Sequence, residues 1–401
     1  MSELSYLEKL PDGAEVEWLP LSSLCNLITT GKLNANAMED NGAYPFFTCN
    51  EEPYRINTYA FDLEAILISG NGSQVGHLNY YNGKFNAYQR TYILGGFNEN
   101  VDIMYLYYYL MHTLKPYIHK NSRKGSVPYI TMPMLENFKF PIPCPNNLEK
   151  SLAIQSEIVR ILDKFTALTA ELTAELTMRK KQYNYYRDQL LSFDNEDVPH
   201  LPMGQKDIGE FIRGGTFQKK DFMDAGVGCI HYGQIYTYYG TYTKKTKTHI
   251  SAALAKKCKK AQKGNLIIAT TSENDEDVCK AVAWLGSDDI AVSSDACIYK
   301  HNLNPKYVSY YFQTEQFQNQ KRQYITGAKV RRVNADNLSK ILIPVPSMAV
   351  QERIVSILDK FDTLTNSITE GLPREIELRQ KQYEYYRDLL FSFPKPETAS
   401  N

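Results

Sequence analysis

The sequence predicts an α+β protein in which two mixed α/β domains are separated by two long α-helices that form an antiparallel coiled coil. Three features support this fold class: an internal repeat, apolar seams at helical spacing, and short apolar runs bounded by turns. ILDKF occurs at residues 161–165 and again at 357–361, and KQYNYYRD at 181–188 returns as KQYEYYRD at 381–388. A duplication of this kind gives the chain an internal pseudo-two-fold repeat.

Each repeated segment predicts a long helix. Residues 151–193 contain no proline or glycine, and apolar side chains recur every three or four residues, as in a coiled-coil seam. At 1.5 Å per residue this helix could reach roughly 60 Å. The second copy contains Gly371-Leu372-Pro373-Arg374, which has no counterpart in the first, and Pro373 should break or kink it. We expect the two helices to pair; the alternative is that each packs only on its own domain.

Residues 169–176 read TAELTAEL, a perfect tetrapeptide repeat within the first helix. Four residues are slightly more than one helical turn, so one unit changes the helix length by about 6 Å and rotates the remainder of the helix. Alanine, glutamate and leucine are also good helix formers, which is the alternative explanation. We interpret the repeat as a spacer.

Composition and junctions divide the chain into five parts. IPCP at 142–145 and IPVP at 343–346 precede the helices. We therefore expect a variable domain at 1–145, a helical spacer at 146–193, a second variable domain at 194–346, a second spacer at 347–393 and a tail at 394–401. Both variable domains contain strand-like runs and one aromatic helix. The expected strands are Ala65–Ser69, Gln74–Leu78, Thr91–Leu94, Leu266–Thr271, Ala281–Leu285, Ile290–Ser293 and Cys297–Tyr299, and the expected helices are Met104–His112 and Val308–Phe312.

The net charge of zero, from 45 basic and 45 acidic residues, conceals an asymmetry. The first variable domain has 10 basic and 14 acidic residues (net −4), whereas the second has 21 and 16 (net +5). Lysine and arginine cluster in the second domain at 219–220, 244–247, 256–260 and 329–332, with tyrosines between them. This pattern is typical of phosphate contact in DNA binding, although a solvated basic surface is the competing explanation.

Several kinds of chemistry lack their motifs. The chain has no G-x-x-x-x-G-K-[ST] loop, no C-x-x-C and no H-E-x-x-H, so a P-loop ATPase and a zinc site are not expected. The acidic run at 273–277 could bind a cation, but we expect a solvated loop. Seven scattered cysteines fit a reducing cytoplasm. No apolar run approaches the length needed to span a bilayer, and the N-terminus has no signal-peptide pattern.

Together these features resemble the DNA-specificity subunit of type I restriction–modification systems. The two ILDKF…KQYxYYRD segments, the IPCP and IPVP junctions and the TAEL repeat carry the resemblance. The repeat points to the subfamily in which the number of tetrapeptides varies. GNGSQVG with FNAYQRTYIL (85–94), and GNLIIATTSEN (264–274) with IAVSSDACIY (290–299), look like parts of that family's target-recognition domains.

The resemblance implies a non-catalytic subunit without a cofactor or metal of its own. Each recognition domain would read one half of a bipartite double-stranded DNA target. The helices would set the spacer and dock two modification (methyltransferase) subunits. S-adenosylmethionine, ATP and Mg would belong to partner subunits, which include restriction and motor subunits, in the cytoplasm and away from any membrane. The runner-up is a coiled-coil assembly scaffold whose globular domains bind protein. A fused methyltransferase-specificity enzyme is disfavoured because no S-adenosylmethionine motif is visible.

Candidate DNA-contacting residues are polar or cationic residues in or beside predicted loops, where they can reach phosphates and base edges. Turn hydrogen bonds are a competing role for Ser73 and Asn86. The candidates are Ser73, Gln74, Asn86, Gln89, Arg90, Arg123, Lys124 and Ser126 in the first domain, and Lys219, Lys220, Gln234, Thr271, Ser272, Lys329, Arg331 and Arg332 in the second.

Overall fold

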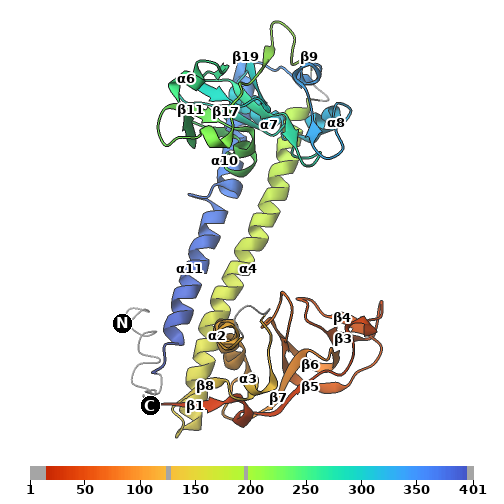
Figure 1. The fold of residues 1–401 in the computed structure, drawn as a ribbon, viewed down its shortest axis with the longest axis vertical. Helices are drawn as coiled ribbons and strands as arrows, with labels where there is room; N and C mark the ends of the chain where they lie inside the picture. Colours follow the sequence, from red (N-terminus) through yellow and green to blue (C-terminus); the bar gives the residue numbers. More distant parts are fainter. Residues whose placement is uncertain (1–14, 123–127, 194–196, 395–401) are drawn as a thin grey trace. The chain divides into compact units, whose positions relative to one another are not determined.

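The computed structural model describes residues 15–122, 128–193 and 197–394 and forms two compact units (Figure 1). Unit 1 comprises residues 1–170 and 378–401, and unit 2 comprises residues 171–377. Each unit combines one variable domain with parts of both repeated helical segments. None of the helices in the described ranges is long and apolar enough to cross a membrane.

Unit 1 is built on a six-stranded sheet with the order β2-β7-β5-β6-β3-β4. Its central pairs are antiparallel, whereas β3 pairs with the end of β6 in parallel. The strands expected at 65–69 and 91–94 are confirmed. The elements are β1 (Val16–Pro20), β2 (Cys25–Thr30), β3 (Tyr44–Phe47), β4 (Tyr54–Ile56), β5 (Phe61–Ser69), β6 (Leu78–Ala87), β7 (Thr91–Phe97), β8 (Lys139–Pro143), α2 (Ile103–Asn121) and α3 (Met132–Glu136).

The strand expected at Gln74–Leu78 was wrong. Gly72 and Gly76 have φ angles of +81° and +79°, a left-handed conformation that glycine adopts readily and that ends an extended run. The amide of Val75 donates to the carbonyl of Gly72. Residues 70–77 therefore form the turn between β5 and β6, and the strand begins only at Leu78.

The core of unit 1 forms between its sheet, α2 and both helical segments. Asp102 caps α2 by accepting from the amides of Met104 and Tyr105. Tyr105 and Tyr109 then pack on Phe391, which directly follows the last helix of the second repeated segment. Burial of each such aromatic side chain contributes a few kcal/mol. Phe391 is thus part of the core of the first variable domain.

Unit 2 contains a five-stranded sheet with the order β10-β19-β15-β17-β12, and a four-stranded sheet β13-β11-β18-β14. All four strands expected in this domain are confirmed, with a break at Thr270 between β15 and β16. The elements are β9 (His200–Pro202), β10 (Gly209–Arg213), β11 (Val227–Ile230), β12 (Tyr242–Thr243), β13 (Thr248–Ile250), β14 (Lys260–Ala261), β15 (Leu266–Ala269), β16 (Thr271–Ser272), β17 (Ala281–Trp284), β18 (Ile290–Val292), β19 (Ala296–His301), β20 (Arg331–Arg332), β21 (Leu342–Pro344), α5 (Tyr232–Thr237), α6 (Ala252–Ala255), α7 (Pro305–Tyr311), α8 (Glu315–Arg322) and α9 (Ala335–Leu338).

The first repeated segment forms one continuous helix, α4 (Leu148–Ser192), whereas the second is split into α10 (Met348–Asn366) and α11 (Leu372–Leu390). The predicted break is confirmed, and it lies before Pro373. The proline occupies the first turn of α11, where its missing N–H would have no helical acceptor. Gly371, at φ +84°, is needed because a Cβ there would lie 2.3 Å from the carbonyl oxygen of Thr363.

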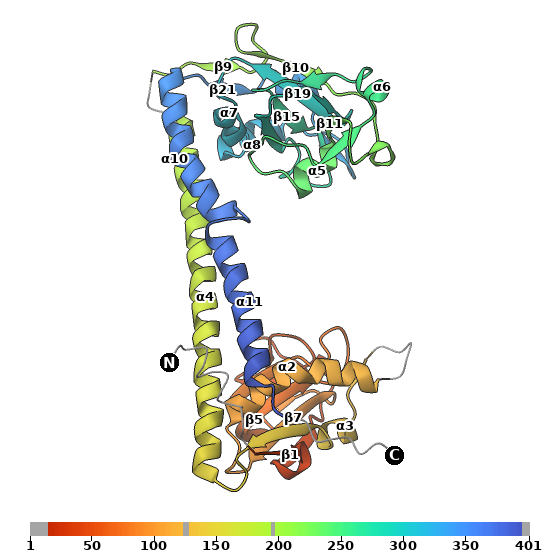
Figure 2. The ribbon, with the colours of Figure 1, turned by 90° about the vertical axis from the view of Figure 1, so that its left-hand side faces the viewer.

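The helices pair antiparallel within each unit, and the expectation of pairing is confirmed. In unit 1, Phe165 of α4 packs on Tyr383 and Tyr386 of α11. In unit 2, Phe361 of α10 stacks on Tyr186 near the end of α4, so that α10 lies along that part of α4 (Figure 2). The alternative, in which each helix packs only on its own domain, is wrong.

Candidate nucleic-acid interface

One backbone arrangement occurs in both variable domains, at the end of a central strand. After β5, the amide of Gly70 donates to the carbonyl of Arg90 (2.9 Å), and the amide of Ile130 donates to the carbonyl of Gly70 (2.9 Å). After β15, Thr270 donates to Asp295 (2.9 Å) and Val333 donates to Thr270 (3.1 Å) in the same way. The two domains therefore hold three loops together by equivalent backbone hydrogen bonds.

We call this hydrogen-bonded arrangement the frame; it is formed by residues 70, 90 and 130 in unit 1 and by residues 270, 295 and 333 in unit 2. One glycine in each domain adds a further hydrogen bond beside it. Gly31 donates to the carbonyl of Thr91 (3.1 Å), and Gly214 donates to the carbonyl of Ala296 (3.0 Å). A Cβ at either glycine would lie 2.0 Å from a backbone oxygen, of Ala87 or Ser293 respectively. No larger residue fits at these positions, where two segments of the backbone approach closely. Backbone atoms alone consequently hold the frame together, so the side chains of its residues can differ between the two domains.

The side chains around the frame do differ. In unit 1 a hollow of about 330 Å³ is lined by Gln89 and Arg90 together with Gly70, Tyr92 and Ile130. The equivalent hollow in unit 2, of about 290 Å³, is lined by Asp295 and Arg332 among others. Arg90 and Asp295 occupy the same frame position and carry opposite charges. Equivalent sites with different polar groups are suited to recognising different ligand edges.

The turn between β5 and β6 presents polar side chains beside the hollow of unit 1. Ser73 is exposed at the turn, whereas Gln74 is half-buried. The amide Nε2 of Gln74 donates to Oε1 of Glu51 over 3.1 Å. This contact fixes Gln74 against the loop that follows β3.

A short hairpin presents three of the cationic candidates of unit 2, Lys329, Arg331 and Arg332. Thr326 and Arg332 exchange backbone hydrogen bonds of 2.9 Å in both directions, which closes residues 327–331 into a loop. Its tip exposes Lys329 and Val330. The Nε atom of Arg331 lies 2.8 Å from Oδ1 of Asp275, and its Nη1 donates to the carbonyl of Gly327 over 2.7 Å. The hairpin thus carries one tethered arginine, Arg331, beside the exposed Lys329 and Val330.

The structure places the sequence candidates in four groups. The first is exposed, the second is half-buried at the rim of the frame or hairpin, the third is buried, and the fourth lies outside the described residues. The exposed candidates are Ser73, Gln89, Arg90, Lys219, Lys220, Lys329 and Arg332. The half-buried candidates are Gln74, Ser272 and Arg331, and the buried ones are Asn86, Gln234 and Thr271. Arg123, Lys124 and Ser126 lie outside the described residues.

The buried candidates have partners inside their own domain. Asn86 donates to the carbonyl of Thr58 and accepts from the amide of Ala87. Gln234 donates to Oγ1 of Thr248 over 3.0 Å and accepts from the amide of His231. Buried amides with such partners hold loops in place and have little capacity left for a ligand.

Sequence reasoning missed Asp295 and considered Asp275 only as part of the acidic run at 273–277; both adjoin the candidate positions. The signal for Asp295 was present in the sequence. When the runs FNAYQRTYIL and IAVSSDACIY are aligned end to end, Arg90 and Asp295 fall at the same place. Asp275 offered no comparable signal, because its contact with Arg331 joins loops 56 residues apart.

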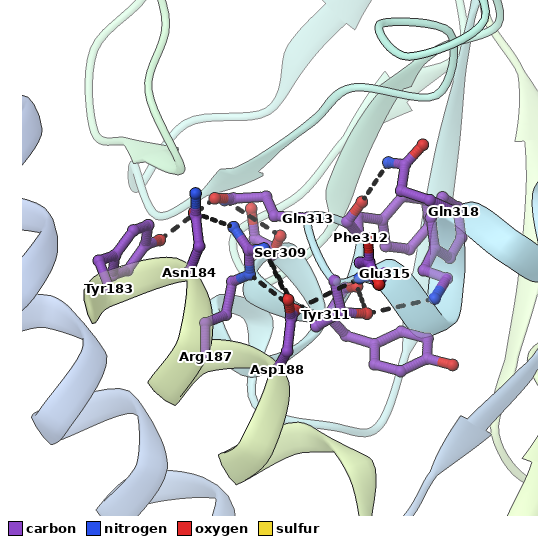
Figure 3. Close-up of polar contacts among 12 residues, drawn as sticks. Tyr183, Asn184, Arg187, Asp188, Ser309, Tyr311, Phe312, Gln313, Glu315 and Gln318 are labelled. Carbon is purple, nitrogen blue, oxygen red and sulfur yellow. Dashed lines mark hydrogen bonds and ion pairs between the residues drawn. The ribbon is translucent and has the colours of Figure 1, made fainter. Parts of the chain in front are cut away.

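The KQYxYYRD motif fastens each helix to a variable domain, and Figure 3 shows the copy in unit 2. In unit 2, Tyr183 donates to Oε1 of Gln313 over 3.2 Å, and Oδ1 of Asp188 accepts from the amide of Glu315 over 3.3 Å. Arg187 pairs with Asp188 at 3.1 Å. In unit 1 the equivalent Asp388 lies 3.6 Å from Nε2 of His112. Tyr183, Arg187 and Asp188 of this motif therefore make contacts inside unit 2.

The ILDKF motif provides the second fastener. Asp163 accepts from the hydroxyl of Tyr108 in unit 1. Asp359 accepts from the hydroxyl of Tyr310 (2.7 Å) and also from the ammonium of Lys306 (2.6 Å) in unit 2. Burial, together with nearby carboxylates, raises the pKa of Tyr310 well above its ordinary value. The hydroxyl thus stays protonated and donates to the carboxylate.

Catalytic chemistry finds little support in this part of the molecule. Within the described ranges, no three His, Cys, Asp or Glu side chains gather as a possible metal site. The hollow of unit 1 is lined mainly by polar surface and that of unit 2 by polar and apolar surface together. The arrangement is suited to recognition by hydrogen bonding and charge.

Comparison with known proteins identifies the family. Residues 14–178 and 202–378 match the family model of the type I restriction modification DNA specificity domain. The chain is 40% identical over 414 residues to the type I restriction enzyme EcoR124I/EcoR124II specificity subunit of Escherichia coli, with 100% of both chains covered. It is 33% identical to a putative type I specificity subunit of Haemophilus influenzae, covering 97% of this chain and 98% of the relative.

The fold agrees with that relationship. The solved structure of a type I restriction–modification S subunit from M. genitalium superposes with a TM-score of 0.55 at 15% identity, covering 96% of this chain and 98% of that one. The two matched regions each include one of the equivalent backbone frames. The chain therefore belongs to the family of type I restriction–modification DNA-specificity subunits.

Proposed function

We propose that this chain is the non-catalytic subunit that selects the DNA target of a type I restriction–modification enzyme. Each variable domain reads one half of a bipartite double-stranded target. The observation that carries the proposal is the backbone frame shared by both domains, with Arg90 in one and Asp295 at the same place in the other. A common frame with different polar side chains explains how one architecture can read two different half-sites.

The DNA-contacting set is narrower than the sequence candidates. Exposed side chains beside the frames and on the hairpin serve as base or phosphate contacts, and the buried Asn86, Gln234 and Thr271 serve as loop supports. Lys219, Lys220 and Lys329 suit phosphate contact because they are exposed and cationic. Arg123, Lys124 and Ser126 stay candidates for the first half-site.

The paired helices act as the ruler between the half-sites. The TAELTAEL repeat lies wholly within the continuous helix α4, where each unit adds about 6 Å. Two half-site readers joined by a stiff connection gain affinity through high effective concentration. The length of the unread DNA spacer should therefore follow the number of repeats.

The helical segments also dock two modification subunits, one for each copy of the repeat. Tyr185 and Tyr385, at the same position of the two KQYxYYRD motifs, are 61% and 55% exposed. Duplicated exposed aromatic residues are suited to binding two copies of one partner. S-adenosylmethionine, ATP and Mg²⁺ act on the modification and restriction subunits, in the cytoplasm.

The test is to purify the chain with its modification subunits and map the methylated adenines on genomic DNA. A split motif with a fixed gap is the expected result. A continuous motif would contradict the bipartite reading. Absence of any motif would favour the alternative, a scaffold whose globular domains bind protein.

A further inference from the structure

Arg331 is tethered at two of its nitrogens while remaining accessible. Its Nε lies 2.8 Å from Oδ1 of Asp275, and its Nη1 donates to the carbonyl of Gly327 over 2.7 Å. The side chain is 36% exposed. A guanidinium has five N–H donors. One of them, on Nη1, is used in the hydrogen bond to Gly327, and the ion pair with Asp275 restricts the group further, so that donors remain for a ligand.

The carboxylate that holds Arg331 is anchored from the protein core. Asp275 lies in the acidic loop between β16 and β17. Lys321 of α8 is fully buried beneath this loop, and its ammonium donates to the carbonyls of Glu276 (3.1 Å) and Val278 (2.8 Å). A buried cation requires such partners, so it holds the backbone next to Asp275 in a single position. The side chains of residues 273–277 are all exposed, as expected for a solvated acidic loop, while its backbone is held from below.

The other tether is equally restrained. Gly327 has a φ angle of +91°, and a Cβ there would lie 2.1 Å from the carbonyl oxygen of Val330. The hairpin is closed by the two backbone hydrogen bonds between Thr326 and Arg332. Both groups that hold Arg331 therefore belong to well-defined backbone.

The neighbouring arginine provides a contrast. Arg332 is exposed, and among the described residues its guanidinium has no side-chain partner. A mobile cation is sufficient for a phosphate, whereas reading a base edge requires donors at fixed positions. The two adjacent arginines are thus prepared for different contacts.

We propose that Arg331 reads a guanine in the second half of the DNA target and that Asp275 is its positioning residue. The inference rests on the proposed function. An arginine that donates two hydrogen bonds to O6 and N7 of guanine is the commonest specific contact in the major groove. Asp275 would hold the guanidinium plane in register with that edge. Its negative charge would also reduce indiscriminate attraction of Arg331 to phosphates.

The experiment uses the chain in complex with its modification subunits. Methylation rates are measured on duplexes that carry the mapped target or a single base-pair change at each position. Arg331→Ala should relax one G·C position of the second half-site by about tenfold or more. Asp275→Asn should relax the same position by about threefold to tenfold, and Asp275→Glu should restore part of the discrimination. Every position of the first half-site should be unchanged.

Two controls separate this effect from general charge and folding effects. Glu273→Gln removes one negative charge from the same exposed loop and should leave discrimination at all positions unchanged. Arg332→Ala should slow methylation of all duplexes alike and reduce the salt dependence of binding. Thermal unfolding of each variant in a Trp18→Phe background, followed by the fluorescence of Trp284, reports whether unit 2 is folded.

The outcomes distinguish the inference from the proposed function. If the wild-type complex methylates a split motif but Asp275→Asn stays within twofold of wild type at every position, Asp275 does not position a reading residue. If Arg331→Ala weakens all duplexes uniformly, Arg331 contacts phosphate. A wild-type complex without a split motif would instead refute the proposed function.

Discussion

Substitution of Asp359 by Asn should destabilise unit 2 more than the equivalent substitution of Asp163 destabilises unit 1. Both aspartates occupy the third position of an ILDKF motif, and both accept a hydrogen bond from a tyrosine, Tyr310 or Tyr108. Only Asp359 also binds a cation, the ammonium of Lys306, at 2.6 Å. The repeat therefore supplies an internal comparison of one carboxylate with and without an ion pair.

The structure sets the size of the difference. The side chains of Lys306 and Asp359 are 20% and 28% exposed, so the pair is partly shielded from water. An asparagine can still accept from the tyrosine, which limits the cost in unit 1 to about 1 kcal/mol. In unit 2 the lost charge leaves Lys306 without its counterion, and we expect a cost of about 2 kcal/mol. For units of this size, that corresponds to roughly 4–8 °C in the unfolding midpoint.

The two tryptophans allow each unit to be followed separately. Trp18 lies in unit 1 and Trp284 in unit 2. A Trp18→Phe background makes fluorescence report unit 2 alone, and Trp284→Phe makes it report unit 1. Each aspartate variant is compared with its own single-tryptophan parent. A midpoint shift below 1 °C for Asp359→Asn, or a larger shift for Asp163→Asn, would refute the reasoning.

Two further predictions concern the side chains beside the two backbone frames and the pH dependence of the stability of unit 2. Arg90→Ala should relax the first half-site only and Asp295→Ala the second only, as measured by methylation of single-substitution duplexes; an effect of either variant on the other half-site would contradict independent reading. Burial lowers the pKa of His301 to about 4. The imidazole of His301 therefore takes up a proton more readily in the unfolded chain than in the folded one. The free energy of unfolding of unit 2 should therefore be unaffected by His301 above about pH 6.5 and should fall by up to about 3 kcal/mol as the pH falls toward 4. His301→Gln should flatten that part of the profile of Trp284 unfolding, and an unchanged slope would exclude His301 as the cause.

Local patterns predicted the local structure well. Apolar runs such as Leu266–Thr271 became strands because residues buried on both faces need not alternate. The strand predicted at Gln74–Leu78 does not form, because Gly72 and Gly76 adopt left-handed conformations that end the extended run. The packing of Phe391 in the first domain could not be predicted, because it joins parts of the chain almost 300 residues apart.

The candidate site shows the same limit. Glycine, polar and cationic residues in loops marked the regions near both frames, and the aligned position of Arg90 and Asp295 was already present in the sequence. Burial decided the role of Asn86 and Gln234, and burial depends on tertiary packing. The contact between Asp275 and Arg331 joins two loops that are distant in the sequence, and the buried Lys321 that anchors the acidic loop comes from a third segment.

The most direct measurement is a genome-wide map of methylated adenines for a chain from which one TAEL unit, residues 173–176, is deleted. Removing about 6 Å of helix corresponds to one or two base pairs of DNA at about 3.4 Å each. Two independent readers on a helical ruler predict the same two half-sites as in the wild type, with a gap shorter by one or two base pairs. A changed half-site, or an unchanged gap, would contradict the account.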